Sequence, residues 1–159
     1  MRIGVLSDTH GRLHPRVMEL FAGVDHILHA GDIGKPEIIT ELRTLAPLSA
    51  VFGNVDGFPL AGQFAERVLL SFSGTAIFMT HVVQDRTPSG LYRLLREAGA
   101  ETASVIIYGH THEACIDEVE QLLLFNPGSA GPARFNMRPS VGLLTLAPGG
   151  AAHAEIITL

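Results

Sequence analysis

The chain has 159 residues, of which 47% are hydrophobic and 17% charged, so it can bury a substantial core and does not have the composition of a disordered chain. A formal net charge of −5, without a Lys or Arg cluster, disfavours binding to long nucleic acid. The single Cys115 rules out an internal disulfide and a thiolate-rich metal cluster. No stretch reaches the ~18 apolar residues of a membrane span. We therefore expect one cytoplasmic domain over residues 1–159 and no membrane partner.

Apolar runs of strand length alternate with helical patterns in the first half of the chain. Helices are expected at residues 14–22, 36–45 and 88–98, where Pro15 and Pro36 suit a first turn and Gly99 a C-cap. Strands are expected at 3–6, 27–29, 49–52, 67–72, 76–79 and 104–108, then at 114–117, 122–125, 141–146 and 154–157. This order predicts an α/β fold with a partly parallel sheet, hairpin strands in the second half, and helices outside.

Five of these strands are followed by side chains that commonly bind metals. In chain order they are Asp8 and His10, Asp32, Asn54 and Asp56, His81, and His110 and His112. Loops at the carboxyl ends of strands converge in open α/β sheets, so these groups are expected to share one site. Without Asp56, they amount to two carboxylates, one amide and four imidazoles, a set suited to Mn, Fe, Zn, Ni or Co rather than to Ca. Seven donors suit two ions that share a carboxylate.

Three glycines precede these candidate ligands directly. Gly31, Gly53 and Gly109 stand before Asp32, Asn54 and His110. Glycine allows the backbone to turn sharply or to approach a site closely. We therefore expect these loops to pass close to the site.

The motif series resembles that of the calcineurin-like metallophosphoesterase superfamily. The matching segments are "DTH" at 8–10, "GD" at 31–32, "GN" at 53–54, "TH" at 80–81 and "GHTH" at 109–112. "HILHAGDIG", "GNVDG" and "FNPGSAGPAR" are similar to the small phosphodiesterases of bacteria and archaea. The resemblance implies a four-layer α-β-β-α sandwich, in which two mixed sheets lie face to face with helices outside.

The resemblance also implies how two divalent ions would be held. One ion would bind Asp8, His10 and His112, the other would bind Asn54, His81 and His110, and Asp32 would bridge them. Manganese is the expected metal, with iron, zinc, nickel or cobalt as alternatives. The chain departs from the family pattern at Val55, where many members carry a histidine that protonates the leaving group. It departs again at 82–83, where "VV" replaces "GH".

The function implied is that of a phosphodiesterase that hydrolyses a small phosphate ester through a hydroxide bridging the two cations. Asn54 would coordinate a metal and bind the phosphate, Asp56 would orient a metal ligand, and Arg134 would face the substrate anion. His14, His26, His29 and His153 are interpreted as ordinary packed or surface histidines.

Two alternatives use the same fold. A phosphomonoesterase would have the same metal centre, and a non-catalytic scaffold, such as the eukaryotic retromer subunit of similar fold, would have lost the chemistry. Neither a glycine-rich nucleotide loop nor a G-x-S-x-G nucleophile elbow is present in the sequence. A homo-oligomer is possible.

Overall fold

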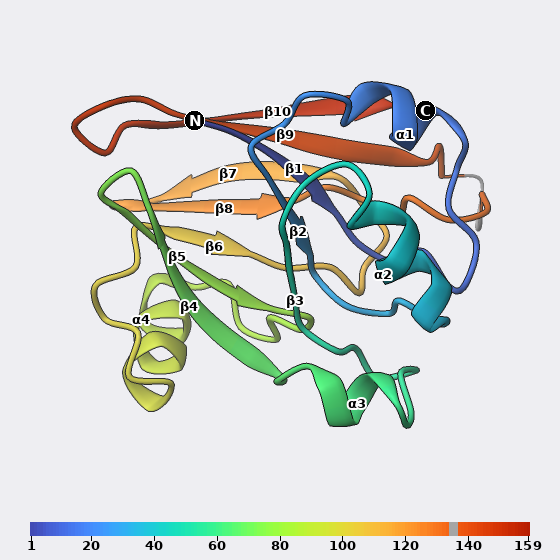
Figure 1. The fold of residues 1–159 in the computed structure, drawn as a ribbon. Helices are drawn as coiled ribbons and strands as arrows, with labels where there is room; N and C mark the ends of the chain where they lie inside the picture. Colours follow the sequence, from blue (N-terminus) through green and yellow to red (C-terminus); the bar gives the residue numbers. More distant parts are fainter. Residues whose placement is uncertain (134–136) are drawn as a thin grey trace.

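The chain forms two five-stranded sheets in the computed structural model (Figure 1). The structure describes residues 1–133 and 137–159. The first sheet has the order β10-β9-β1-β2-β3, formed by Ala152–Thr158, Ser140–Leu146, Arg2–Leu6, His26–His29 and Leu48–Ala50. The second has the order β4-β5-β6-β8-β7, formed by Arg67–Phe72, Thr75–Thr80, Val105–Ile107, Leu122–Asn126 and Cys115–Val119. Both sheets are mixed, because β1, β2 and β3 run parallel, as do β5, β6 and β8, while the remaining pairs are antiparallel.

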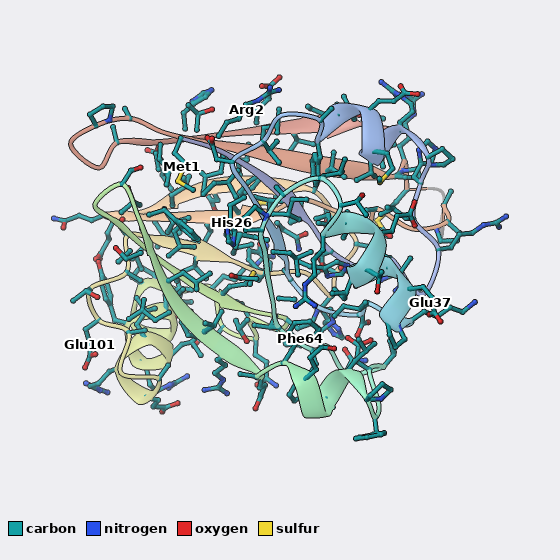
Figure 2. The ribbon with its side chains drawn as sticks, in the orientation of Figure 1. Met1, Arg2, His26, Glu37, Phe64 and Glu101 are labelled. Atoms are coloured by element: carbon teal, nitrogen blue, oxygen red, sulfur yellow. The ribbon has the colours of Figure 1, made fainter. Side chains whose placement is uncertain are left out.

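The side chains of β1 pack on both faces of the first sheet. Ile3 and Val5 belong to the apolar cluster between the sheets, together with Ile77, Met79 and Phe125 of the second sheet. Successive side chains of a strand point to opposite faces, so Gly4 and Leu6 face outward, where Gly4 leaves room for the Phe21 ring. Figure 2 shows the side chains that fill the space between the sheets, with the exposed Glu37 and Glu101 at the periphery.

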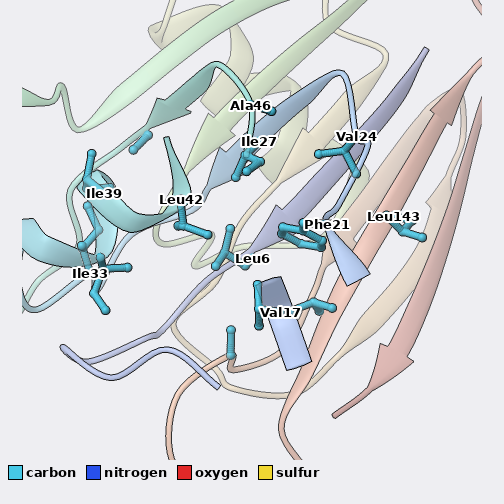
Figure 3. Packing of buried hydrophobic residues seen from close by; sticks show 14 of the residues in the cluster. Leu6, Val17, Phe21, Val24, Ile27, Ile33, Ile39, Leu42, Ala46 and Leu143 are labelled. Atoms are coloured by element: carbon cyan, nitrogen blue, oxygen red, sulfur yellow. The ribbon is translucent and has the colours of Figure 1, made fainter. Parts of the chain in front are cut away.

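Two helices, α1 (Arg16–Leu20) and α2 (Pro36–Leu42), cover the outer face of the first sheet. Figure 3 shows their contacts, in which Val17 and Leu42 pack with Leu6 and Ile27 of the strands. On the outer face of the second sheet, Leu91 and Leu95 of α4 (Pro88–Glu97) pack against Phe78 and Ile106. The predicted α-β-β-α sandwich with two mixed sheets is therefore confirmed.

The ends of α4 follow the expected capping chemistry. The Thr87 side chain accepts a hydrogen bond from the backbone N–H of Gly90 at the N-terminus. At the other end, Gly99 has a φ of 63°, and the N–H groups of Gly99 and Ala100 donate to the carbonyl oxygens of Arg96 and Leu95. This is a Schellman motif, which explains why the glycine signal located the end of the helix.

The helices differ from the sequence predictions in two respects. The first two are shorter than predicted because the chain continues in single turns of the i to i+3 type after each helix, such as Val24 N–H to Phe21 oxygen and Leu45 N–H to Leu42 oxygen. Their apolar residues therefore stay on the same face beyond the helix end. The four-residue helix α3 (Leu60–Gln63) was not predicted, since it is too short to show a periodic pattern.

Within residues 1–133 and 137–159, no helix has the length and apolar character to cross a bilayer.

Candidate metal centre

The loop after β1 and the loop after β2 are held together by backbone hydrogen bonds. The N–H groups of Asp8, His10 and Gly11 donate to the carbonyl oxygens of Gly31, Asp32 and Ile33 at 3.0, 2.9 and 2.7 Å. This pairing carries the side chains of Asp8, His10 and Asp32 to one place. It follows from the parallel pairing of β1 with β2, which places the carboxyl ends of both strands at the same edge.

Loops of the second sheet meet this pair from the opposite side. The Gly109 N–H donates to the carbonyl oxygen of His81 at 3.0 Å, and the His110 N–H donates to Asp8 Oδ2 at 3.1 Å. The His81 ring also crosses between the sheets, because its Nδ1 lies 2.7 Å from the carbonyl oxygen of Ala30. The loops that follow four different strands, β1, β2, β5 and β6, thus form one site.

One half of the site contains Asp8, His10 and His112, each of which offers a ligand atom within 4.8 Å of the others. Asp8 Oδ1 lies 3.2 Å from His112 Nε2 and 3.8 Å from His10 Nε2. The two Nε2 atoms are only 3.1 Å apart. At this distance either one ring N–H donates to the other Nε2, or both lone pairs face a cation, so this half of the site can hold a positive ion.

The other half is built around Asp32 and His81. Asp32 Oδ1 lies 3.3 Å from His81 Nε2, and Asp32 Oδ2 lies 3.9 Å from His10 Nε2. The two oxygens of this carboxylate thus face the two halves of the site. Asp8 is near enough to group with Asp32 and His81 as well, so the halves adjoin.

Asn54 and His110 complete the second half at its exposed side. Asn54 Oδ1 lies 2.9 Å from His110 Nδ1, and the rings of His110 and His81 are 5.3 Å apart at an interplanar angle of 82°. All seven residues that the sequence singled out as metal ligands therefore lie in one connected cluster.

The candidate ligands have an unusual backbone. Seven non-glycine residues in the described ranges have positive φ, and five of them are candidate ligands: Asp8, His10, Asp32, His110 and His112, with φ between 47° and 70°. This conformation is uncommon for residues with a Cβ and costs of order 1–3 kcal/mol each. Such strain persists where the surroundings impose it, and it accumulates at functional sites.

The three glycines beside the ligands allow the close approach that the sequence predicted. A Cβ at Gly31 would meet the His81 ring, one at Gly53 would meet Asp32, and one at Gly109 would meet Ser7 and Asp8. Each substitution would push a second element away from the site. These glycines therefore allow neighbouring loops to pack closely around the site.

The residues fit a cation because buried ligand atoms remain without hydrogen-bond partners in the described part of the chain. These atoms are Asp8 Oδ1 and His81 Nε2. Since a carbonyl oxygen only accepts, His81 Nδ1 must carry the proton toward Ala30, which leaves the Nε2 lone pair directed into the site. A neutral imidazole in this tautomer is a metal ligand.

The two buried carboxyl groups have different proton affinities. Burial raises the pKa of Asp8 above its ordinary value. Burial also opposes ionisation of Asp32, but the His81 imidazole 3.3 Å away and the hydrogen bond from the Val55 N–H outweigh it and lower the pKa of Asp32. Desolvation opposes protonation of His81, yet the nearby Asp32 carboxylate and the hydrogen bond to Ala30 raise the His81 pKa. A divalent cation would favour the ionised carboxylates and the neutral imidazole.

Asp56 lies beside the site but does not make the contact that the sequence suggested. Its buried carboxylate accepts hydrogen bonds from the backbone N–H groups of Ile33, Gly34 and Gly53, at 3.0, 2.7 and 2.9 Å. We expected Asp56 to orient a metal-binding side chain directly. It instead joins the loop of Asp32 to the loop of Asn54.

Other supporting residues were missed or only partly foreseen. His29 is fully buried at the end of β2, where its Nδ1 accepts from the Gly31 N–H and its Nε2 lies 3.0 Å from Thr9 Oγ1. Burial lowers the pKa of His29 to about 3, so this ring is a neutral structural link and not a ligand. It was correctly interpreted as a packed strand residue, but its link to the loop after β1 was not predicted.

Asn126 supports the "GHTH" loop by hydrogen bonds to its backbone and to a side chain. Its Nδ2 donates to the Gly109 carbonyl oxygen and to Thr111 Oγ1, both at 3.0 Å, while its Oδ1 accepts from the Gly128 N–H. The only signal in the sequence was its place in "FNPGSAG", directly after an apolar run.

Two further positions that the sequence singled out are the predicted substrate contact Arg134 and the departure from the family pattern at Val55. Arg134 lies outside the described residues. Val55, at the position where many family members carry histidine, has a side chain that is 53% exposed, while its backbone N–H donates to Asp32.

Comparisons with known proteins agree with this geometry. Residues 1–149 match the family model described as the calcineurin-like phosphoesterase superfamily domain. A probable metallophosphoesterase of Methanothermobacter thermautotrophicus is 39% identical over 99% of this chain and 92% of its own length. A phosphodiesterase of Methanocaldococcus jannaschii is 32% identical over 91% of this chain and 92% of its own.

A solved structure extends the similarity to a protein of another kind. Wild-type Vps29 of Entamoeba histolytica, in complex with zinc, superposes with a TM-score of 0.77 and 25% identity, over 99% of both chains.

Proposed function

Because this chain belongs to the calcineurin-like phosphoesterase superfamily, we propose that it is a dinuclear metal-dependent phosphodiesterase that acts on a small phosphate ester. The observation that carries the proposal is the convergence of candidate ligands from separate loops, five of them in two groups that share Asp8, with Asn54 and His110 beside His81. Asp8 Oδ1 and His81 Nε2 are buried and without hydrogen-bond partners among the described residues. A buried polar atom of this kind is costly unless a ligand satisfies it.

Each metal ion would have its own set of side chains. Asp8, His10 and His112 would hold one ion, and Asn54, His81 and His110 would hold the other. Asp32 would be shared, an assignment supported by its two oxygens, which face His81 and His10 respectively. The mixture of carboxylate, amide and imidazole donors favours manganese, with iron, zinc, nickel or cobalt as alternatives.

Bound divalent ions of this kind lower the pKa of water and neutralise charge on a phosphoryl group. Hydrolysis adds the water oxygen to phosphorus and breaks one P–O ester bond, and the departing alkoxide takes up a proton. Val55 offers no proton at the position where many members of the superfamily carry histidine. We therefore expect leaving groups of low pKa, which need little protonation, to react fastest.

The chain's own groups would position the substrate. Asn54 is exposed, and when its Oδ1 faces His110 or a metal, its amide N–H groups are left to bind a phosphoryl oxygen. Asp56 holds the Asn54 loop against the Asp32 loop, so it would act on the reaction only through the position of these two groups. Arg134 remains a predicted contact for the substrate anion.

The test is hydrolysis of bis(p-nitrophenyl) phosphate by the purified protein with Mn, Ni, Co or Mg, and with a chelator. We expect turnover with at least one ion and its loss on chelation. His81→Ala should lower the rate by at least about 100-fold, since removal of residues that only support ligands costs ~10–100-fold. The exposed His153→Ala is the matched control. Absence of turnover with all four ions would reject the proposal.

The phosphomonoesterase alternative is separated by the rate on p-nitrophenyl phosphate, which should be lower than the rate on the diester. The similarity in fold to Vps29 is the observation that supports the scaffold alternative. A scaffold would show no metal-dependent hydrolysis even when metal analysis finds bound ions.

A further inference from the structure

A pocket of about 290 Å³ lies beside the loop that carries Asp8 and His10. Two segments, 12–15 and 131–132, form its walls, and the lining residues are Arg12, Leu13, His14, Pro15, Gly131 and Pro132. None of these residues belongs to the seven candidate ligands. The pocket is therefore separate from the proposed metal centre but adjoins it along the chain.

Both walls of the pocket are attached to the metal-binding loop. On one side, the Arg12 N–H donates to the carbonyl oxygen of Thr9 at 2.9 Å. On the other, the Ser129 hydroxyl donates to the carbonyl oxygen of Asp8 at 2.9 Å, and a Cβ at Gly131 would lie 2.6 Å from the Thr9 oxygen. The His14 N–H joins the walls by donating to Ala130 at 3.1 Å. Since Arg12 follows His10 by two residues, its Cα lies within ~7 Å of the His10 Cα.

The lining favours a planar apolar group that is attached to an anion. Leu13, Pro15 and Pro132 are apolar, and the proline rings are rigid. Arg12 is exposed, and a guanidinium both stacks on aromatic rings and pairs with anions. A cavity of about 150 Å³ can hold a benzene ring, so the pocket has room for a ring together with a group of sugar size.

A second pocket, of about 250 Å³, opens near His81 but has the wrong charge for an anionic ester. Its walls include three carboxylates, from Glu66, Asp85 and Glu97. The two arginines in its lining are within 3.7 and 3.4 Å of Glu66 and Asp85, so their charges are already matched. This comparison favours the pocket beside Arg12.

We propose that the pocket between residues 12–15 and 131–132 binds one of the two ester groups of the phosphodiester, the one that stays on the phosphate when the other is released. This retained group is aromatic or of nucleoside size. Arg12 is then a specificity-determining residue, which stacks on the ring or pairs with the phosphate. This inference rests on the proposed phosphodiesterase function. It adds the class of substrate that the centre prefers.

Three diesters that release the same p-nitrophenolate test the proposal: the methyl, phenyl and thymidine-5′ esters of p-nitrophenyl phosphate. The wild-type protein should show a kcat/KM at least tenfold higher for the phenyl and thymidine esters than for the methyl ester, mainly through KM. Two variants should each reduce this preference at least fivefold: Arg12→Gln, which removes the guanidinium, and His14→Trp, which fills the pocket. Arg43→Gln, an exposed arginine at the end of α2, is the control and should keep it.

Thermal unfolding and metal content of each variant show whether it is folded and loaded. Equal kcat/KM for all three esters in the wild-type protein, or an equal loss on all three in the variants, would overturn the proposal. If no ester is hydrolysed, the proposed function has failed, and the pocket is then judged by calorimetric binding of thymidine 5′-phosphate. Weaker binding in Arg12→Gln than in Arg43→Gln would support the pocket, and absent or equal binding would overturn it.

Discussion

Removal of the Asp56 carboxylate should loosen the metal centre without touching any candidate ligand. In Asp56→Ala, the N–H groups of Ile33, Gly34 and Gly53 lose their common acceptor. Asp56 is only 8% exposed, so water replaces the lost carboxylate poorly. The variant therefore separates the positioning of two loops from the coordination chemistry itself.

The size of the effect follows from the three hydrogen bonds. A hydrogen bond to a charged group contributes roughly 1.5–3 kcal/mol, and neighbouring bonds to one carboxylate are not additive. We therefore expect Asp56→Ala to lower the free energy of unfolding by about 3–4 kcal/mol. For a chain of this length, that corresponds to a melting temperature lower by roughly 10 °C. Displacement of Asp32 and Asn54 should weaken manganese binding by ~10–100-fold.

Urea unfolding in the presence of a chelator measures the first quantity, and calorimetric titration with Mn measures the second. Asp25→Ala is the matched control, because the Asp25 carboxylate accepts one hydrogen bond from the Arg2 N–H at an exposed position. It should change stability far less and leave Mn affinity unchanged. A loss below about 1 kcal/mol in Asp56→Ala, or unchanged Mn affinity, would refute the positioning role.

Three further predictions concern other buried polar groups. Asn126→Ala removes both donors and the acceptor that support the "GHTH" loop, so urea unfolding should show a loss of about 2–3 kcal/mol, and a loss below 1 would contradict this. Burial raises the pKa of Asp8, so its ionised form is disfavoured in the folded state; Asp8→Asn should therefore stabilise the metal-free protein by ~1 kcal/mol at pH 7, while abolishing stabilisation by Mn. Lower stability of Asp8→Asn in chelator would count against that account. Burial lowers the pKa of His29 in the folded protein to about 3, whereas the ordinary value for the unfolded chain is 6.5. Between pH 7 and 5 the unfolded chain therefore binds a proton that the folded protein does not, and the metal-free protein should lose about 2 kcal/mol of stability. His29→Gln should remove most of that pH dependence, and an unchanged slope would show that another group causes it.

Strand periodicity predicted the partly parallel sheet and the collection of candidate ligands at strand ends, whereas the face-to-face sandwich followed only from the resemblance to the phosphoesterase family. Val5 and Leu6 point to opposite layers, and the polar residues begin directly after Leu6. The same change from apolar to polar residues follows β2, β5 and β6. Parallel pairing then brings these strand ends together, without any information about the loops.

The supporting contacts could not be predicted from the sequence because they join loops across the fold. Asp56 was expected to face a metal ligand, but it bonds the backbone of Ile33 and Gly34, which are more than 20 residues away. Likewise, the hydrogen bond between His29 and Thr9 joins β2 to the loop after β1, and nothing local in either segment indicates it. The positive φ of His10 and His112 depends on the same packing, since a residue with a Cβ adopts this conformation only uncommonly.

Anomalous scattering from crystals grown with Mn tests the central claim most directly. We expect two peaks ~3.5–4 Å apart, one among Asp8, His10 and His112 and the other among Asn54, His81 and His110, with Asp32 between them. A protein saturated with Mn that shows no peak inside this cluster, or a single ion bound elsewhere, would contradict it.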